Sequence, residues 1–487
     1  MAFGQFIDHD VNFVPTNPMP RLETSLGRRP GFLESTDPFN IEVPRGDPFY
    51  EQFNSRSLAL NRSLACCRCR MGPRDQMNSR TSFIDASQIY GVSKDITDSL
   101  RMFSGGLLRS QVVRGSVFPP GSMEPNNDTC SMPREGKICF RSGDLRMNQN
   151  AGLVTLHTIF LRDHNRIARK LAAINPLWED ERLFHVTKRI VEARFQHVVF
   201  NEWLPAIVGP QVMTDYDLWP RKSGYTGYKP RVDPTMTNEF AVAAFRFGHS
   251  NIDGRFNLVG PRGNQWGALE LKDTYFQPFE FYNRGVHDSA VRGFIQQPMQ
   301  ATDRFGDPAA TNFLFRVPGR PFGNDLFAVD IQRGRDHGIR PYVDYVRHCG
   351  NFNVTSFADL YRHNLMPKRI AVLYSQIYED VRDIDLFSAG LSEFPAPGAA
   401  MGHTFLCMVA DMFHRLKWGD RFYYEHGAQA GSFKPGQLHT IRKTTLAKII
   451  CENTRISSRV QRNVFRSRQP KVDCEDLPDI QLKFWAD

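Results

Sequence analysis

The chain has 487 residues, of which 41% are hydrophobic and 23% charged, a composition that supports a large folded core and excludes disordered and collagen-like chains. Its 61 basic and 52 acidic residues give a net charge of +9, but the basic residues are scattered rather than grouped, which argues against nucleic-acid binding. No run of 18 apolar residues is present, so a membrane-spanning helix is not expected.

Helical periodicity is the main signal along the chain. The proline-rich stretch 14–50 and the Gly-, Pro- and Asn-rich stretch 104–150 predict loops. Apolar spacing predicts two long helices, over 153–172 and over 179–208, the second ended by Gly209-Pro210. Loops are expected again over 261–325, and further helices over 238–247, 356–364, 368–380, 401–416 and 435–453. Because strand-like alternation is scarce and no repeat occurs, we expect a mainly α fold with long loops and very little β, as one domain over 1–487.

Cysteine usage indicates an oxidising compartment. Six of the nine cysteines are well separated, which suits three disulfides, whereas Cys66, Cys67 and Cys69 crowd together without the second ligand pair that a zinc site needs. Three glycosylation sequons point the same way; they begin at Asn61, Asn127 and Asn353. We therefore expect an extracellular, secreted protein. Since Met1 is followed directly by Ala-Phe-Gly-Gln-Phe and no signal peptide, we expect the chain to begin part-way through a protein.

The segment Gly4–Asp10 places three polar side chains on one helical face. Gln5, Asp8 and His9 stand at positions i, i+3 and i+4, whereas Asp10 projects in another direction. A plain surface histidine explains an isolated Asp-His-Asp equally well, so this segment alone decides nothing.

A second segment spaces oxygen-bearing side chains at Thr81, Asp85 and Ser87. A loop that wraps a hard cation uses such hydroxyl, carbonyl and carboxylate oxygens. An ordinary turn or strand end is the alternative explanation.

Two further segments contain candidate metal-binding groups. Arg246 and His249 lie three residues apart at the end of a predicted helix, where a histidine is either a core residue or an axial iron ligand. Asp330 lies in a polar segment that is either a solvated charge run or, if buried, a group that orients a metal-bound histidine.

Taken in order, these segments resemble the animal haem peroxidases, the superfamily of myeloperoxidase, peroxidasin and the arthropod peroxinectin and chorion-type peroxidases. The resemblance runs over essentially the whole chain and implies a single large peroxidase domain that lacks its N-terminal segment. Six blocks carry it: Gly4–Asp10, Thr81–Ser87, Gly143–Arg146, Leu156–Arg166, Phe245–His249 and Gln332–Gly338.

The resemblance assigns roles to individual residues. It implies a distal glutamine, histidine and arginine at Gln5, His9 and Arg146. It implies haem b, held by an ester at Asp8, the proximal ligand His249 and its neighbours Arg246 and Asp330. It implies Ca²⁺ bound by Asp10, Thr81, Phe83 (through its carbonyl), Asp85 and Ser87. It also implies the disulfides Cys130–Cys139, Cys349–Cys407 and Cys451–Cys474.

The sequence departs from the family pattern at several positions. Gln149 stands where myeloperoxidase-like members have a glutamate for a second haem ester, and Asn150 replaces the methionine of the sulfonium link. We therefore expect at most one ester, through Asp8. Asp330 stands where many members have asparagine, and a carboxylate there predicts a more basic proximal ligand and a lower iron reduction potential.

The sequence thus predicts a secreted peroxidase that reduces hydrogen peroxide and oxidises a small donor, namely phenols such as tyrosine, halides or thiocyanate. The alternative is a peroxinectin-like adhesion or matrix protein, in which Arg45-Gly46-Asp47 contacts an integrin and peroxidase activity is secondary. A lipid dioxygenase has no support, because no radical-tyrosine motif is recognisable. The sequence contains no pattern that identifies the physiological donor or the oligomeric state.

Overall fold

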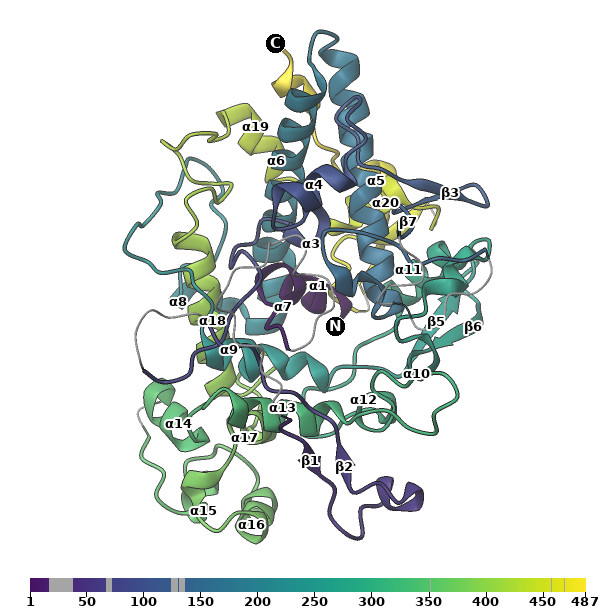
Figure 1. Ribbon diagram of the computed structural model, residues 1–487. Coiled ribbons are helices and arrows are strands. Elements are labelled where there is room, and N and C mark those ends of the chain that lie inside the picture. The colour runs from purple at the N-terminus through teal and green to yellow at the C-terminus, as the bar shows by residue number, and fades with distance from the viewer. Residues whose placement is uncertain are drawn as a thin grey trace.

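Two long helices form the centre of the molecule. The computed structural model describes residues 1–16, 38–66, 72–123, 130, 136–350, 352–456, 458–467 and 469–487. Helix α5 (Ala151–Ile174) begins after Asn150, whose side chain accepts a hydrogen bond from the Leu153 amide, and packs along α6 (Asp180–Val198) (Figure 1). Shorter helices surround this pair, and the sheets of the described residues have two strands each. The predicted mainly α fold with very little β is confirmed.

The other elements are short. Before α5 the chain forms α1 (Ala2–Val11), β1 (Ile41–Glu42), η1 (Tyr50–Phe53), β2 (Ser57–Leu58), α3 (Ser87–Tyr90), α4 (Lys94–Leu100), β3 (Gln111–Val113), β4 (Ser116–Phe118) and η3 (Leu145–Asn148). After α6 come the π-helical turn η4 (Val199–Trp203), α7 (Leu204–Val208), α8 (Pro210–Asp215), α9 (Asn238–Val242), η5 (Ala244–His249), β5 (Arg255–Val259), β6 (Gln265–Glu270), α10 (Leu271–Thr274), η6 (Pro278–Tyr282), α11 (Val286–Gln296) and α12 (Pro308–Thr311).

The C-terminal third is again helical. It contains α13 (Leu326–Asp336), α14 (Tyr342–Gly350), α15 (Phe357–Arg362), α16 (Lys368–Ile377), η7 (Val381–Asp383), α17 (Leu386–Ser392), α18 (His403–Trp418), α19 (Pro435–Ile441), α20 (Leu446–Asn453), β7 (Arg459–Gln461), β8 (Lys471–Asp473), η8 (Cys474–Asp476) and η9 (Leu482–Trp485). Each strand pairs antiparallel with its neighbour in sequence, β1 with β2, β3 with β4, β5 with β6 and β7 with β8.

Both long helices are confirmed, but three other predicted spans are wrong. The region 261–325 is not mainly loop, because it contains β6, η6, α11 and α12. The helix expected over 238–247 breaks at Ala243 (φ −134°, ψ −70°) into α9 and η5. The helix expected over 435–453 stops at Ile441 and resumes as α20, and α13 and α14 are missing from the prediction. Of the loop expected over 14–50, residues 17–37 lie outside the described residues.

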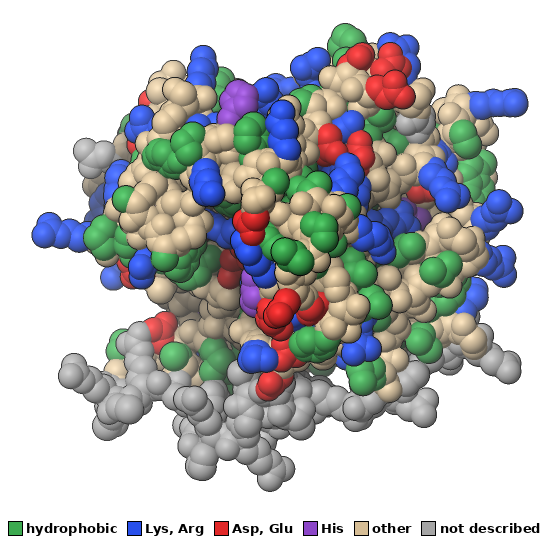
Figure 2. Space-filling model, turned by 90° about the horizontal axis from the view of Figure 1, so that it is seen from above, with side chains coloured by type: hydrophobic (Ala, Val, Ile, Leu, Met, Phe, Trp, Pro, Cys, Tyr) green, Lys and Arg blue, Asp and Glu red, His purple; other side chains and the backbone are tan. Residues whose placement is uncertain are grey.

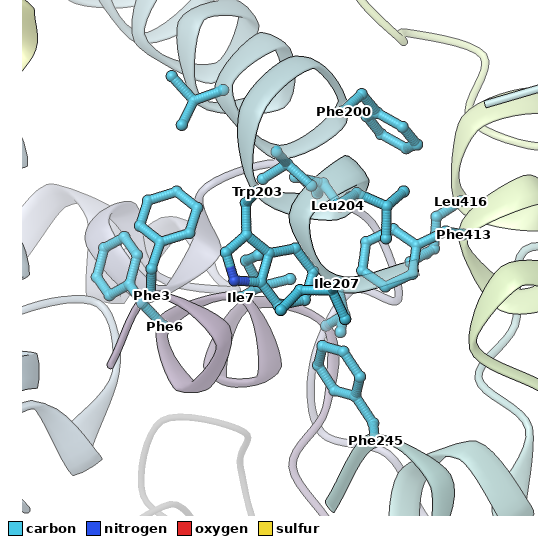
Figure 3. Close-up of a cluster of buried hydrophobic side chains, with 14 of the residues drawn as sticks. Phe3, Phe6, Ile7, Phe200, Trp203, Leu204, Ile207, Phe245, Phe413 and Leu416 are labelled. Carbon is cyan, nitrogen blue, oxygen red and sulfur yellow. The ribbon is translucent and has the colours of Figure 1, made fainter. Parts of the chain in front are cut away.

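A buried indole joins the first helix to the middle of the chain. Trp203, in η4, packs between α1 and η5 (Figure 3). Its ring centroid lies 6.1 Å from that of Phe245 and 5.8 Å from that of Phe413. A Cβ atom added to Gly4 would lie 3.1 Å from Cζ2 of Trp203, so α1 approaches the indole closely because position 4 has no side chain. The segments that carry His9 and His249 therefore share one core.

Among the described residues three disulfides occur, Cys130–Cys139, Cys349–Cys407 and Cys451–Cys474, which confirms the implied pairing. Cys66 is an exposed free thiol in the described part of the chain, whereas Cys67, Cys69 and the sequon at Asn127 lie outside it. No helix among the described residues is long and apolar enough to cross a membrane. Basic and acidic side chains are intermixed over the face shown in Figure 2, in keeping with their scattered positions in the sequence.

Candidate active site

Helix α1 presents the first group of candidate residues. His9 is buried, with 3% of its surface exposed. Gln5 is held by Asn150, whose Nδ2 donates to Oε1 of Gln5 at 2.8 Å, while Oδ1 of the same asparagine caps α5. Asn150 thus fixes the amide of Gln5 relative to the central helix. The sequence prediction misses this role. An asparagine just before a helix signals the cap, but nothing in the pattern signals the contact with Gln5.

Arg146 lies beside the backbone of the same helix. Its guanidinium donates to both carboxylate oxygens of Asp144, with the shortest contact at 2.7 Å, and Nη2 also donates to the carbonyls of His9 (3.3 Å) and Asn12 (3.1 Å). Burial favours the neutral form of Asp144, but Arg146 and Arg80 outweigh it and hold the pKa of this carboxyl far below its ordinary value. Arg146 is therefore positioned by a buried counter-charge.

The imidazole of His9 is neutral in this environment. Burial, and next the charge of Arg146, lower its pKa well below 6.5. Its Nδ1 is buried and has no hydrogen-bond partner among the described residues. A neutral buried histidine can take up a proton and return it, which is the behaviour expected of a general acid–base group.

The second group of candidate residues comes from η5 and α13. Nδ1 of His249 lies 2.5 Å from Oδ2 of Asp330, and Nη1 of Arg246 donates to Oδ1 of the same carboxylate at 2.5 Å. Asp330 is fully buried, whereas the side chain of His249 is 29% exposed. Because Nδ1 faces the carboxylate, Nε2 is the nitrogen of His249 that can bind a metal. The structure thus brings the three predicted residues together.

Asp8 connects the two groups. Burial raises the pKa of its carboxyl, and the charge of Arg146, the hydrogen bond from Asn12 and the charge of Arg246 oppose that shift. Because Coulomb interactions weaken with distance, the guanidinium groups of both Arg146 and Arg246 lie within electrostatic reach of Asp8. Asn12 joins α1 to α9 at the same place, since its Nδ2 donates to Oδ1 of Asp8 (3.1 Å) and to the carbonyl of Ala241 (3.2 Å).

The predicted cation loop folds around Asp10. Ser87 donates from its amide (2.6 Å) and its hydroxyl (2.7 Å) to Oδ1 of Asp10, and the Ala86 amide donates to Oδ2 at 3.0 Å. Burial, and next the neighbouring Asp85 carboxylate, raise the pKa of Asp10 well above its ordinary value. Two buried like charges favour a bound cation, which would neutralise both.

The remaining predicted ligands lie in the same loop. The hydroxyl of Thr81 lies 3.4 Å from the amide of Phe83 and 3.5 Å from its carbonyl oxygen. No group of three His, Cys, Asp or Glu side chains that could hold a metal occurs in the described part of the chain. A cation here therefore depends on hydroxyl and carbonyl oxygens besides two carboxylates, a donor set that suits Ca²⁺.

A cavity of about 770 Å³ lies behind this loop rather than at the histidines. Its lining includes Phe83, Asp85 and Asp420, but not His9 or His249. We therefore assign the chemistry to the side chains described above, and not to this cavity.

These residues form a recognisable class of site. A histidine backed by a buried carboxylate is suited to bind haem iron, while a neutral histidine and a permanently charged arginine are suited to break the O–O bond of a peroxide. The donor set fits haem, because Nδ1 of His249 is taken up by Asp330 while Nε2 remains for a metal, and because Arg246 and Arg146 both act electrostatically on Asp8. A fold and residues of this kind are those expected of a haem peroxidase.

Comparison with known proteins agrees with this class. The animal haem peroxidase family matches residues 1–465, and the chain belongs to this family. The chain is 39% identical over 508 residues to a chorion peroxidase of Drosophila melanogaster, covering 100% of this chain and 61% of that protein. It is 35% identical over 503 residues to a peroxidase of the same organism, covering 100% of this chain and 72% of that protein.

Solved structures show the same relationship. Peroxidase A from Dictyostelium discoideum superposes with a TM-score of 0.78 at 30% identity, covering 96% of this chain and 86% of that chain. The chain spans about three fifths of the length of the chorion peroxidase it matches.

The tripeptide Arg45-Gly46-Asp47 lies in an exposed turn in which Gly46 adopts φ +81°. Oδ1 of Asp47 accepts hydrogen bonds from the amides of Phe49 (2.9 Å) and Tyr50 (2.6 Å). One oxygen of this carboxylate is therefore already hydrogen-bonded within the chain.

Proposed function

We propose that this chain is a haem peroxidase that reduces hydrogen peroxide with His9 and Arg146 while His249 ligates the iron. One observation carries the proposal: Arg146 is hydrogen-bonded to the backbone carbonyl of the buried His9, while His249 is hydrogen-bonded to the buried Asp330. Family membership supports haem as the cofactor.

In this proposal, different residues assist different parts of O–O bond cleavage. Haem, when bound, supplies the iron to which peroxide binds and the electrons that reduce it. His9 accepts a proton from one peroxide oxygen and delivers it to the other, which leaves as water. Arg146 stabilises negative charge on the departing oxygen, because its anchoring by Asp144 keeps the guanidinium in place. Asp330 holds the ring of His249 and increases its basicity.

The finer parts of the proposal concern the cofactor and the donor. We propose haem b with at most one ester, through Asp8, because Gln149 offers an amide where a second ester needs a carboxylate. Phenols such as tyrosine, halides and thiocyanate are the proposed donors, since each gives up electrons to a haem peroxidase. The three disulfides support an extracellular location.

The test is an absorption spectrum of the purified, haem-loaded protein before and after hydrogen peroxide is added. We expect the Soret band to shift with peroxide and to return when a phenol or iodide is added. His9→Ala should slow the peroxide-dependent shift by about 10²- to 10⁴-fold, the usual contribution of a general acid–base group. His185→Ala, which removes an exposed histidine of α6, should leave the rate unchanged.

Equal rates in the His9 and His185 variants would contradict the proposed role of His9. His249→Ala should abolish the normal Soret band, because the iron then lacks its protein ligand. A normal band in that variant would exclude His249 as the ligand.

We also propose that Asp10, Thr81, Phe83, Asp85 and Ser87 bind Ca²⁺. Chelation should lower the thermal unfolding temperature, because two buried carboxylates then lose their counter-charge. Added Ca²⁺ should restore it and Mg²⁺ should not, since Mg²⁺ prefers a smaller octahedral site that keeps several waters. Asp85→Asn should abolish the response to Ca²⁺. A chelator-insensitive unfolding temperature would contradict the proposal.

The exposed turn at Arg45 favours a test of the adhesion function as well. An integrin that bound Asp47 would have to compete with the two backbone amides from which this carboxylate already accepts hydrogen bonds. Cell attachment to the wild type and to Asp47→Glu decides the matter: equal attachment removes the tripeptide from consideration, and loss in the variant supports it.

A further inference from the structure

A tyrosine–histidine pair is buried in the core, apart from the residues assigned above. Tyr90 is the last residue of α3, His164 lies in α5, and neither side chain is exposed. The phenolic oxygen of Tyr90 lies 2.8 Å from Nδ1 of His164, and Nε2 of His164 lies 2.9 Å from the carbonyl oxygen of Gly106. Because a carbonyl only accepts, Nε2 carries the hydrogen and Nδ1 keeps its lone pair. Tyr90 is therefore the donor.

His164 is arranged to receive that hydrogen as a proton. Burial lowers its pKa to about 4, so the ring is neutral at rest; the Gly106 carbonyl and the Asp163 carboxylate favour its protonated form, and the charges of Arg101 and Lys188 oppose it. After proton transfer, one N–H of the imidazolium would point at the oxygen of Tyr90 and the other at Gly106. No existing hydrogen bond has to break for the proton to move.

Backbone hydrogen bonds link this pair to the proposed catalytic residues. Gln88, two residues before Tyr90, accepts from the amide of Asp144 at 3.0 Å, and its side chain donates to the carbonyl of Phe6 at 3.1 Å. Asp144 is the carboxylate that anchors Arg146. Helix α3, which carries Tyr90, is thus hydrogen-bonded through Gln88 to the segments that carry His9 and Arg146.

We propose that Tyr90 is a redox-active residue that gives one electron to the peroxide-oxidised haem site while its phenolic proton passes to Nδ1 of His164. The step rests on the proposed peroxidase function, and hydrogen peroxide is its oxidant. Tyr90 loses one electron and one proton, which leaves a neutral tyrosyl radical beside an imidazolium, and the haem site is reduced by one electron. Tyr90 is fully buried. Solvent and small donors therefore do not contact the radical directly and can reduce it only by electron transfer through the protein.

The chain offers a matched control. The hydroxyl of Tyr424 lies 2.7 Å from Nδ1 of His197, and both side chains are buried. Burial and then the charge of Arg442 lower the pKa of His197 to about 3, and Nε2 of His197 is buried without a hydrogen-bond partner among the described residues, whereas Nε2 of His164 has the Gly106 carbonyl. Tyr424 is therefore expected not to be oxidised, although its hydrogen bond is equally short.

The experiment is electron paramagnetic resonance of the haem-loaded protein, frozen shortly after hydrogen peroxide is added without a donor. We expect a tyrosyl signal that narrows when the protein carries ring-deuterated tyrosine. The signal should be lost in Tyr90→Phe and retained in Tyr424→Phe, both checked for a normal Soret band. In the wild type, ¹⁵N-labelled histidine should show coupling to the radical, a result that does not depend on how any variant folds.

Two results would overturn the inference. One is an undiminished tyrosyl signal in a haem-binding Tyr90→Phe protein. The other is a wild-type radical without histidine coupling. A Soret band that responds to peroxide together with either result leaves the proposed peroxidase intact and removes only the role of Tyr90.

Discussion

The carboxylate of Asp330 divides its negative charge between two partners. One oxygen faces His249 and the other accepts from Arg246, each at 2.5 Å. A carboxylate draws more strongly on an imidazole N–H than an amide does and makes the iron ligand more basic. Arg246 limits this effect, because the guanidinium neutralises part of the same charge.

Asp330→Asn should raise the iron reduction potential of the haem-loaded protein, since the substituted amide carries no charge. It should also lower the free energy of unfolding by about 1 to 3 kcal/mol, the usual loss when a hydrogen bond to a charged group is removed. Spectroelectrochemistry and urea unfolding measure the two effects. Asp385→Asn, which removes the partner of Arg335 at the surface, is the control. An unchanged potential in a folded Asp330→Asn protein would contradict the assigned role.

The sequence predicts the candidate catalytic residues and one residue that positions them, Asp330, but not Asn150. His9, Arg146 and His249 were predicted because their residue types and order match a known pattern. In the sequence, Asn150 stands out only because it replaces the methionine of the family pattern. In the structure, its side chain donates a hydrogen bond to Gln5, which lies 145 residues earlier in the chain. Such a contact exists only once α1 has docked on α5, and no local pattern encodes docking.

At the scale of the element, the π-helical turn η4 contains a buried carboxyl. Glu202 is 4% exposed and accepts a hydrogen bond from the Leu446 amide, where α20 begins, at 2.7 Å. Burial raises its pKa from 4.5 to about 8. The folded protein therefore binds a proton that the unfolded chain releases at lower pH.

Glu202→Gln should remove a pH dependence of stability. Because the folded pKa is raised, the stabilisation is complete below pH 4.5 and is lost as the pH rises towards 8. Between these values the Glu202 contribution to the free energy of unfolding falls by about 1.4 kcal/mol per pH unit. Urea unfolding at pH 6 and pH 8 should show wild type and variant diverging. A constant difference across that range would contradict the raised pKa.

The predicted helices also succeed and fail for physical reasons. The long helices α5 and α6 have many turns over which an apolar stripe repeats, so periodicity identifies them. Helix α11 follows Gly285 and contains Gly293, and the missing side chain at 293 lets the carbonyl of Asn257 in β5 approach the helix. Its 11 residues are stabilised by packing rather than by propensity, which explains why the sequence there predicts loop.

At the scale of the whole molecule, the Cys349–Cys407 disulfide joins α14 to α18 across 58 residues. Replacing both cysteines by serine should lower the free energy of unfolding by about 4 kcal/mol, the chain-entropy value for a loop of this length. The Cys451–Cys474 pair closes only 23 residues, so its removal should cost less. Urea unfolding under non-reducing conditions tests the order. A larger loss from the shorter loop would contradict the entropic account.

The indole of Trp203 acts as a spacer between α1, which carries His9, and η5, which carries His249. One of its edges contacts Gly4, next to Gln5, and its ring contacts Phe245, four residues before His249. The spacing between α1 and η5 therefore depends on one rigid side chain. Because a Cβ atom added at Gly4 would lie only 3.1 Å from Trp203, a bulkier residue there would push α1, and His9 with it, away from Trp203 and η5.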